Sequence, residues 1–416
     1  MKFAHLADTH LGRQRNKKLV EIEKRVFQNT IEQILDKDVD FVLIAGDFFD
    51  VNIPNMEIQK LAFEQFKKIK DRDIPIYVIY GSHDFSPNAT SVIDLLNSGG
   101  FFTKIPTEVK NENGKIKLKF FVDPKTGVKI TGLSGLKASR DTTWYEQLDR
   151  NSLESKEGFK IFMFHGGINE MIKENMPEAD FMPLSYLPKN FDYYAGGHMH
   201  KFSDESFPNY NHVVYSGTLF SGFHSDLTDN ANGQKRGFVL VEFEEKIESV
   251  DFIEVPNINY ALIDVNAKNK KSGSVDVELR SKIKELEIKN KIVIINVKGE
   301  LSEGKTTDID FSEIKDELVK KEALSVLINR KQFSSREYNI TSAKGANKEE
   351  IETNVFHENI GQMAIHEKKL LGKDGVSIAK SLLKKIGQPK LDNEKEKEYE
   401  NRIDLEVFEL LGIDVE

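Results

Sequence analysis

Cysteine is absent from the 416-residue sequence, tryptophan occurs once, and no stretch of 18 consecutive apolar residues is present. The absence of cysteine excludes disulfide bonds and thiolate metal sites, so any metal must be held by histidine, aspartate, glutamate or other oxygen ligands. Without a long apolar run no membrane-spanning helix is expected, and the N-terminal segment MKFAHLADTH lacks the apolar core of a signal peptide. The sequence therefore predicts a cytoplasmic protein that does not bind a membrane.

Hydrophobic residues make up 39% of the chain and charged residues 31%, a balance typical of a folded protein. Fifty-nine Lys and Arg residues against 68 Asp and Glu residues give a net charge of -9. Because this charge repels phosphate, nucleic-acid binding would depend on local basic patches. The length predicts two or three domains.

The first 81 residues alternate between short apolar segments and segments with helical periodicity. Strands are predicted at Lys2–Asp8, Asp40–Asp47 and Pro75–Gly81. The intervening helical spacing predicts a parallel α/β sheet that is covered on both faces. Each strand ends in a polar cluster, and ligands bind at the carboxyl ends of strands in such sheets.

A second group of predicted strands comprises Val128–Leu133, Lys160–His165, Tyr193–Ala195, Val213–Ser216 and Gly237–Phe243. The first domain is accordingly predicted over residues 1–256. Residues 257–340 alternate again between strand-like and helical patterns, which predicts a small α+β domain. Residues 341–416 predict a helical tail that contains a charged linker at Lys390–Asp404 and ends in an apolar stripe.

The predicted strand ends carry many residues that can bind metals. The candidate set is Asp8, His10, Asp47, His83, His165, His198 and His200. Alternate residues of an extended segment point to the same side, so Asp-x-His and His-x-His can each direct two side chains at one ion. Mixed carboxylate and imidazole ligands suit Mn, Fe or Zn, and a pair of such ions supports in-line displacement at phosphorus.

These residues carry a family resemblance. In order, the motifs are Asp8-x-His10, Gly46-Asp47, Gly81-x-His83-Asp84, His165 and Gly197-His198-x-His200. This set resembles the calcineurin-like metallophosphoesterase superfamily. The surrounding segments FAHLADTHLG, DFVLIAGDFFD, FMFHGGI, YYAGGHMH and VVYSGT resemble the SbcD-like DNA double-strand-break repair nucleases. The resemblance implies an α/β fold, a metallophosphoesterase β-sandwich flanked by helices.

The resemblance also implies an activity: a DNA exonuclease, endonuclease or both, which processes double-strand breaks with two Mn2+ ions, Mg2+ or another divalent metal being an alternative. It assigns one metal to Asp8, His10, Asp47 and His200. The second metal is assigned to the bridging Asp47, position 82, His165 and His198. His83 would not bind metal but would stabilise the transition state or protonate the leaving 3′ oxygen, as suits an imidazole near neutral pH.

Several partners follow from the same resemblance. They are double-stranded DNA ends, single-stranded DNA, a second copy of the chain and an SMC-like coiled-coil ATPase, which implies a nucleoid-associated location. By position and size, residues 257–340 resemble that family's DNA-capping domain, and the tail resembles the segment that docks the ATPase. The apolar residues considered for a dimer face, or for the core instead, are Leu95, Leu96, Phe101 and Phe102.

Two residues depart from the family pattern. Ser82 stands where the family has a metal-binding Asn, and its shorter hydroxyl is a weaker ligand that a water could replace. Asp50 stands where some members have a histidine linked to exonuclease action, which leaves the balance of exonuclease and endonuclease open. Asp84 is expected either to orient His83 or to shape its turn.

Basic residues close to the metal motifs are candidate contacts for DNA phosphates, with a solvated loop as the competing interpretation. They are Arg13, Arg15, Lys17, Lys18 and Lys201. Two other functions stay open. A phosphatase or cyclic-nucleotide phosphodiesterase would share the fold but needs neither a capping domain nor a tethered apolar terminus. A scaffold that docks the ATPase and DNA without cutting would follow only if Ser82 disables the second metal site.

Overall fold

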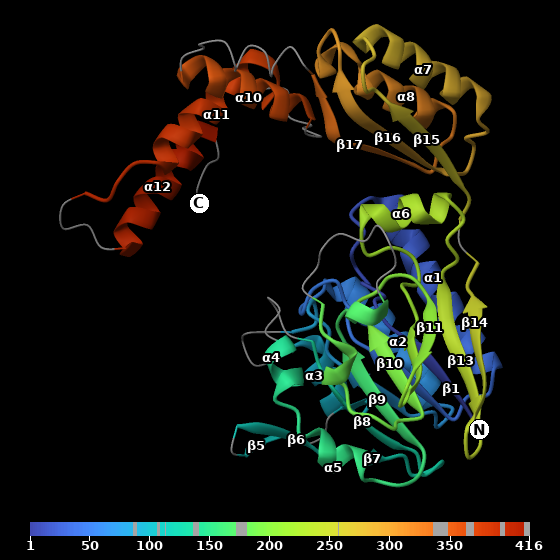
Figure 1. Cartoon of the computed structure of the whole chain (residues 1–416). Helices are drawn as coiled ribbons and strands as arrows, with labels where there is room; N and C mark the ends of the chain where they lie inside the picture. The colour runs from blue at the N-terminus through green and yellow to red at the C-terminus, as the bar shows by residue number, and fades with distance from the viewer. Residues whose placement is uncertain are drawn as a thin grey trace. The chain divides into compact units, whose positions relative to one another are not determined.

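The computed structural model describes residues 1–85, 90–105, 109–112, 114–135, 141–171, 181–256, 258–335, 348–362, 370–391 and 396–411. It divides into two compact units, Met1–Asn259 and Tyr260–Glu416 (Figure 1). The boundary predicted between residues 340 and 341 lies outside the described residues.

Six strands form the first sheet of unit 1, in the order β14-β13-β1-β2-β3-β4. Their bounds are β1 (Lys2–Leu6), β2 (Phe41–Ala45), β3 (Ile76–Ile79), β4 (Thr103–Lys104), β13 (Gly237–Phe243) and β14 (Ile247–Glu254). Strands β1 to β4 run parallel, whereas β13 pairs antiparallel with β1. Every residue of β2 is buried, as its uninterrupted apolar sequence FVLIA predicts for a strand covered on both faces.

A second sheet of six strands has the order β11-β12-β10-β9-β8-β7. Its strands are β7 (Phe121–Val122), β8 (Lys129–Leu133), β9 (Lys160–His165), β10 (Tyr193–Gly197), β11 (Ser203–Phe207) and β12 (Tyr210–Tyr215). Strands β8, β9, β10 and β12 are parallel, and both edge strands are antiparallel. Four strands of the second predicted group therefore lie in this sheet, whereas the fifth, Gly237–Phe243, is β13 of the first sheet.

The two sheets pack face to face. Leu43 of the first sheet and Ile161 and Tyr193 of the second belong to one buried apolar cluster. Residues on the opposite face of the first sheet, such as Val42 and Ile44, are also buried. That face is where the crossover helices α1 (Lys17–Asp36) and α2 (Met56–Lys70) pack, because connections between neighbouring parallel strands share one hand. This arrangement confirms the β-sandwich flanked by helices.

The smaller elements of unit 1 lie between these strands. They are α3 (Val92–Ser98), the hairpin β5 (Val109–Glu112) and β6 (Lys115–Leu118), α4 (Asp141–Glu146), α5 (Arg150–Glu154), η2 (Asn169–Met171), η3 (Leu184–Tyr186) and α6 (His224–Ala231). Of the residues considered for a dimer face, Leu96 and Phe102 are buried, Phe101 packs on Phe63, and Leu95 is exposed. Only Leu95 of α3 thus offers a clearly exposed apolar side chain from that set.

Unit 2 begins with a parallel three-stranded sheet in the order β15-β16-β17. Its elements are β15 (Tyr260–Asn266), α7 (Ser272–Glu285), β16 (Ile292–Leu301), η4 (Thr306–Asp308), α8 (Phe311–Lys320) and β17 (Ser325–Ser335). Residues of the strands and of both long helices form one buried core, for example Val265, Leu279, Ile295 and Leu318. The order of strands and helices follows the alternation predicted from the sequence.

The described residues beyond β17 contain the helices α10 (Lys348–Gln362), α11 (Gly372–Ile386) and α12 (Glu396–Leu411). The linker predicted at Lys390–Asp404 is wrong in its second half, because α12 begins at Glu396. Lys and Glu are good helix formers, and Arg402 pairs with Glu406 one turn further along. Among the described residues, no helix combines the length and apolar character needed to cross a bilayer.

Candidate metal centre

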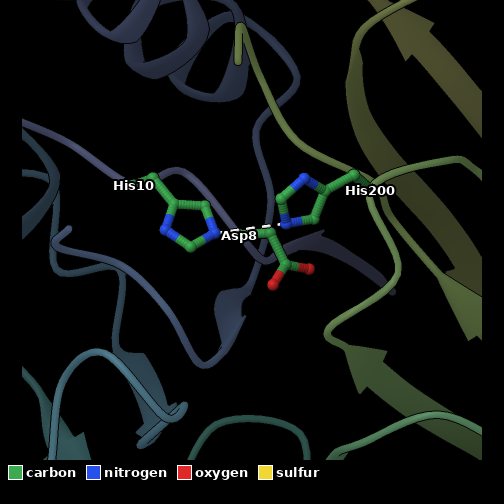
Figure 2. A group of neighbouring side chains, drawn as sticks. All are labelled: Asp8, His10 and His200. Atoms are coloured by element: carbon green, nitrogen blue, oxygen red, sulfur yellow. Dashed lines mark hydrogen bonds between the residues drawn. The ribbon is translucent and has the colours of Figure 1, made fainter. Parts of the chain in front are cut away.

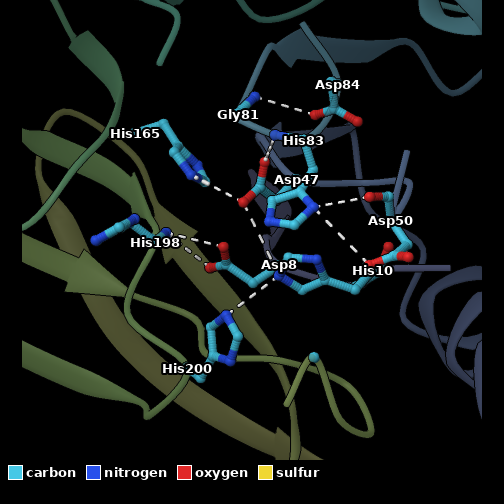
Figure 3. Close-up of polar contacts among 12 residues, drawn as sticks. Asp8, His10, Asp47, Asp50, Gly81, His83, Asp84, His165, His198 and His200 are labelled. Carbon is cyan, nitrogen blue, oxygen red and sulfur yellow. Dashed lines mark hydrogen bonds and ion pairs between the residues drawn. The ribbon is translucent and has the colours of Figure 1, made fainter. Parts of the chain in front are cut away.

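The carboxyl ends of five parallel strands, three from the first sheet and two from the second, bring the predicted ligands together. Asp8 and His10 follow β1, Asp47 follows β2, and His83 follows β3. His165 ends β9, and His198 and His200 follow β10. Figure 3 shows these side chains gathered in one place, where Asp8, Asp47 and His165 have almost no exposed surface.

The chain turns sharply at these strand ends. Asp8, His10, Asp47 and His198 all have left-handed backbone conformations, with φ of 51°, 43°, 49° and 98°. Such a conformation costs a non-glycine residue about 1 kcal/mol or more. Main-chain hydrogen bonds from Asp8 to Gly46 (3.0 Å) and from His10 to Asp47 (3.1 Å) hold the first two turns together. Directing these side chains inward therefore lowers the stability of the fold.

One group of ligand atoms comes from Asp8, His10 and His200, all within 4.8 Å of one another (Figure 2). Nε2 of His10 lies 3.2 Å from Nε2 of His200. Nδ1 of His200 donates to Asp226 at 2.8 Å, so that neutral His200 directs the lone pair of Nε2 at His10. The two Nε2 atoms are within hydrogen-bond distance, so a proton on Nε2 of His10 can bridge them, and a cation bound by both lone pairs would take the place of that proton.

A second group consists of Asp8, Asp47 and His165. Oδ2 of Asp47 lies 3.3 Å from Nε2 of His165 and 3.9 Å from Nε2 of His10. His165 is oriented by Nδ1, which donates to the carbonyl of Ala45 at 2.8 Å. A single oxygen of Asp47 thus lies between imidazoles of the two groups, the position a bridging ligand requires.

His198 lies beside the second group. Its main-chain N–H donates to both oxygens of Asp8 at 2.9 Å, and its ring centroid is 5.6 Å from that of His165. Ser82 is half-buried in the turn that carries His83. The geometry thus gathers the Asp and His residues predicted as ligands, while their metal binding and that of Ser82 stay predictions.

The surroundings set the charge of these groups. Burial raises the pKa of Asp8 to about 6, and lowers the pKa of His10 to about 3 and of His198 to about 4. Burial acts against the charge of Asp47 as well, but His165 and the other imidazoles outweigh it and hold its pKa well below the usual range. Burial likewise opposes a charge on His165, yet Asp47 raises its pKa to about 10. Neutral His10 and His198 are ready to bind a cation, which would displace a proton from His165.

The loop before α6 closes one side of the centre, and the role of Asp226 next to that loop was missed by sequence reasoning. Asp226 accepts from His200 and also from the main-chain N–H groups of Gly222 (2.9 Å) and Phe223 (2.7 Å). A Cβ on Gly222 would come within 2.5 Å of His200 and 2.6 Å of His10, so only glycine fits there. The sequence signal for Asp226 is weak, because an acidic residue in the first turn is common at helix N-termini.

His83 is held next to the centre by two contacts. Its main-chain N–H donates to Asp47 at 2.8 Å, and its Nδ1 donates to the main-chain carbonyl of Asp50 at 2.7 Å. The Asp50 carboxylate is buried and binds Arg13 at 2.9 Å. Asp50, which stands where some family members have a histidine, therefore orients His83 through its main-chain carbonyl and Arg13 through its carboxylate.

Asp84 has the turn-shaping role rather than the role of orienting the His83 ring. Its carboxylate accepts from the main-chain N–H groups of Phe48, Phe49 and Gly81, at 3.0 to 3.2 Å. These bonds join the turns after β2 and β3. A Cβ on Gly81 would come within 2.1 Å of the Asp47 carboxylate, which shows how closely the two turns approach.

The predicted basic contacts differ in their positions. Arg13 is bound to Asp50, and the side chain of Arg15 is 74% exposed and 3.8 Å from the same carboxylate. Lys17 and Lys18 are exposed at the start of α1. Lys201 pairs with Asp229 at 3.0 Å. Arg13 is the one among these five that is held at the metal centre.

We predict that Asp226→Asn weakens divalent metal binding by roughly 10- to 100-fold, because the imidazole of His200 loses the carboxylate that orients it. Equilibrium dialysis with Mn2+ would measure this change. Asp229→Asn is a matched control, since Asp229 lies in the same helix but faces Lys201. Wild-type affinity in Asp226→Asn would contradict the role of this carboxylate.

Comparison with known proteins agrees with this geometry. The family model for calcineurin-like phosphoesterases matches residues 1–202. The DNA double-strand break repair protein Mre11 of Methanococcus maripaludis is 31% identical over 287 residues, which cover 67% of this chain and 73% of that protein. Mre11 of Methanocaldococcus jannaschii is 29% identical over 65% of this chain and 71% of its own length. Mre11 of Sulfolobus acidocaldarius is 28% identical over 64% and 66%, respectively. The chain belongs to the family of the DNA double-strand break repair protein Mre11, and its first domain is a calcineurin-like phosphoesterase.

Proposed function

We propose that the chain is a Mn2+-dependent DNA nuclease that processes DNA ends in double-strand-break repair, with a second copy of the chain and an SMC-like ATPase as partners. The observation that carries the proposal is the buried cluster in which one oxygen of Asp47 lies between the imidazoles of His10 and His165. The Mre11 relatives supply the substrate class, since their name refers to double-strand breaks in DNA.

The donor set fits two divalent ions. Asp8, His10, Asp47 and His200 would hold one, and Asp47, Ser82, His165 and His198 would hold the other. The buried Nδ1 of His10 has no hydrogen-bond partner in the described part of the chain, so the polar contact of this ring is made by Nε2, on the side of His200. Two such ions would supply a nucleophile at neutral pH and would stabilise the charge on the attacking and leaving oxygens.

His83 would act on the leaving oxygen. With Nδ1 bound to the carbonyl of Asp50, the other ring nitrogen is available to the substrate. The ring centroid lies 4.8 Å from that of His10, next to the cluster. In its protonated form, Nε2 would give its proton to the 3′ oxygen as the P–O bond breaks.

The rim of the centre would hold the DNA backbone. Arg13 and Arg15 share the Asp50 carboxylate, which leaves net positive charge there, and Lys17 and Lys18 extend it along the start of α1. Such contacts bind phosphates without reading sequence. Lys201 would have to leave Asp229 before it could take part.

The test is cleavage of a labelled linear duplex by the purified chain, titrated with Mn2+ from zero to several millimolar, with a small phosphodiester in parallel. We expect Mn2+-dependent DNA cleavage. Ser82→Asn should reach half-maximal rate at a lower Mn2+ concentration, because an amide oxygen reaches further and binds better than a hydroxyl.

Other outcomes would separate the alternatives. Turnover of the small ester alone would indicate a phosphatase or cyclic-nucleotide phosphodiesterase. A second site that stays empty of metal at millimolar Mn2+ would indicate a scaffold. DNA cleavage with an identical Mn2+ dependence in Ser82→Asn would show that position 82 is not a ligand.

We predict that His83→Ala lowers the rate of DNA cleavage by roughly 10²–10⁴-fold, the usual effect of losing an acid–base group. Its metal content should equal that of the wild type, because His83 is not assigned to either ion. Metal analysis of the same preparation is the necessary control. If the variant loses metal together with activity, His83 is a ligand and the proposed role is wrong.

The tail has the features of a docking segment. Polar contacts link α11 and the segment after it to α12: Lys385 pairs with Glu406 at 3.1 Å, and Tyr399 donates to the carbonyl of Gln388 at 2.9 Å. Ile403, Val407 and Leu410 are half-buried, whereas other apolar side chains face solvent, with Leu383 51%, Ile386 57% and Leu405 60% exposed. An amphipathic helical segment with its apolar side exposed suits binding to a coiled coil.

We predict that deletion of residues 390–416 abolishes binding to the SMC-like ATPase but leaves Mn2+-dependent cleavage intact. The double variant Leu383→Glu/Ile386→Glu should have the same effect without shortening the chain. Lys373→Glu, at an exposed position of the same helix, is the matched control. Undiminished capture of the ATPase in a pull-down by both variants would rule out this docking site.

A further inference from the structure

Phe223 is a large apolar residue that remains 45% exposed beside a cluster of polar groups. Its ring stacks on the imidazole of His200, with centroids 5.2 Å apart and an interplanar angle of 13°. The centroid of His10 is 5.9 Å away. The imidazole of His200 and the guanidinium of Arg13 each cover part of the ring, and Phe223 still leaves 45% of its surface exposed at the edge of the candidate metal centre.

The backbone fixes the ring in this position. The N–H of Phe223 donates to Asp226 at 2.7 Å, and its carbonyl accepts from the hydroxyl of Ser221 at 2.8 Å. The preceding Gly222 lies directly against His10 and His200. The ring is therefore preorganised, and it would lose little conformational freedom on contact with a ligand.

A cation accompanies the ring. The guanidinium carbon of Arg13 lies 5.2 Å from the ring centroid, and Asp50 binds the same guanidinium from the other direction. The amide of Gln14 reaches the carbonyl of Ser221 at 3.3 Å, which joins the two loops. An exposed aromatic surface and a positive charge at one position match the two parts of a nucleotide, its base and its phosphate.

We propose that Phe223 determines substrate specificity by stacking on a nucleobase next to the scissile phosphate, while Arg13 binds the adjoining phosphate. Bases inside a duplex are already stacked on their neighbours, so the site would accept an unpaired nucleotide from a single strand or a frayed end. The inference rests on the proposed nuclease function. It adds that the enzyme selects a nucleotide whose base is unpaired.

The experiment compares wild-type protein with Phe223→Leu, which keeps apolar bulk but removes the ring, and with Phe223→Trp, which restores a stacking surface. Each is assayed with Mn2+ on a single-stranded oligonucleotide and on bis(p-nitrophenyl) phosphate, a phosphodiester without nucleobases. Phe101→Leu is a matched control, because this ring also lies near a cation, Lys70 at 5.0 Å, but belongs to another part of unit 1.

We expect the ratio of DNA cleavage to ester hydrolysis to fall by about tenfold or more in Phe223→Leu, through a higher KM for DNA. The ratio should recover in Phe223→Trp and stay unchanged in Phe101→Leu. Equal losses on both substrates would mean that the ring acts through His200, and an unchanged ratio would mean that it does not contact DNA. Either result would overturn this inference alone, whereas a wild-type protein that hydrolyses only the ester would overturn the nuclease function as well.

Discussion

The structure of the first unit depends on the placement of one buried carboxylate, that of Asp47, among imidazoles. Its Oδ2 faces His165 and His10, and its Oδ1 accepts from the main chain of His83. A buried negative charge is tolerated only where such partners surround it. Strands from both sheets must therefore end at the same point, which fixes how the two halves of the sandwich pack.

The convergence of these strand ends strains the backbone locally. Non-glycine residues take left-handed conformations at the strand ends, and glycines 81 and 222 admit the backbone to within contact distance of the ligands. Asp84 then ties the turns after β2 and β3 together through main-chain N–H groups. Strain of this kind persists only where the surrounding core enforces it, and the strands β2, β3, β9 and β10 that end at the centre are fully buried.

The parts of the molecule divide between chemistry, substrate positioning and assembly. The strand ends supply the buried candidate ligands, whereas the loop before α6 and the loop after β1 supply Phe223 and Arg13 at the rim. The tail follows a different principle, because polar contacts link α11 to α12 while apolar residues such as Leu405 stay exposed. Each part thus offers the surface that its proposed ligand requires: a cation, a nucleotide or a coiled coil.

Much of the fold and of the metal centre could be predicted from the sequence, because buried parallel strands and their polar ends leave a local pattern. Asp8, His10, Asp47 and the His198-x-His200 pair are found in this way, and α12 was misjudged only because charged residues serve helices and linkers alike. The contacts of Asp226, Phe223 and Asp50 leave no such pattern. These contacts join residues that are far apart in the sequence. Which backbone and side-chain groups meet is therefore decided by the tertiary packing alone.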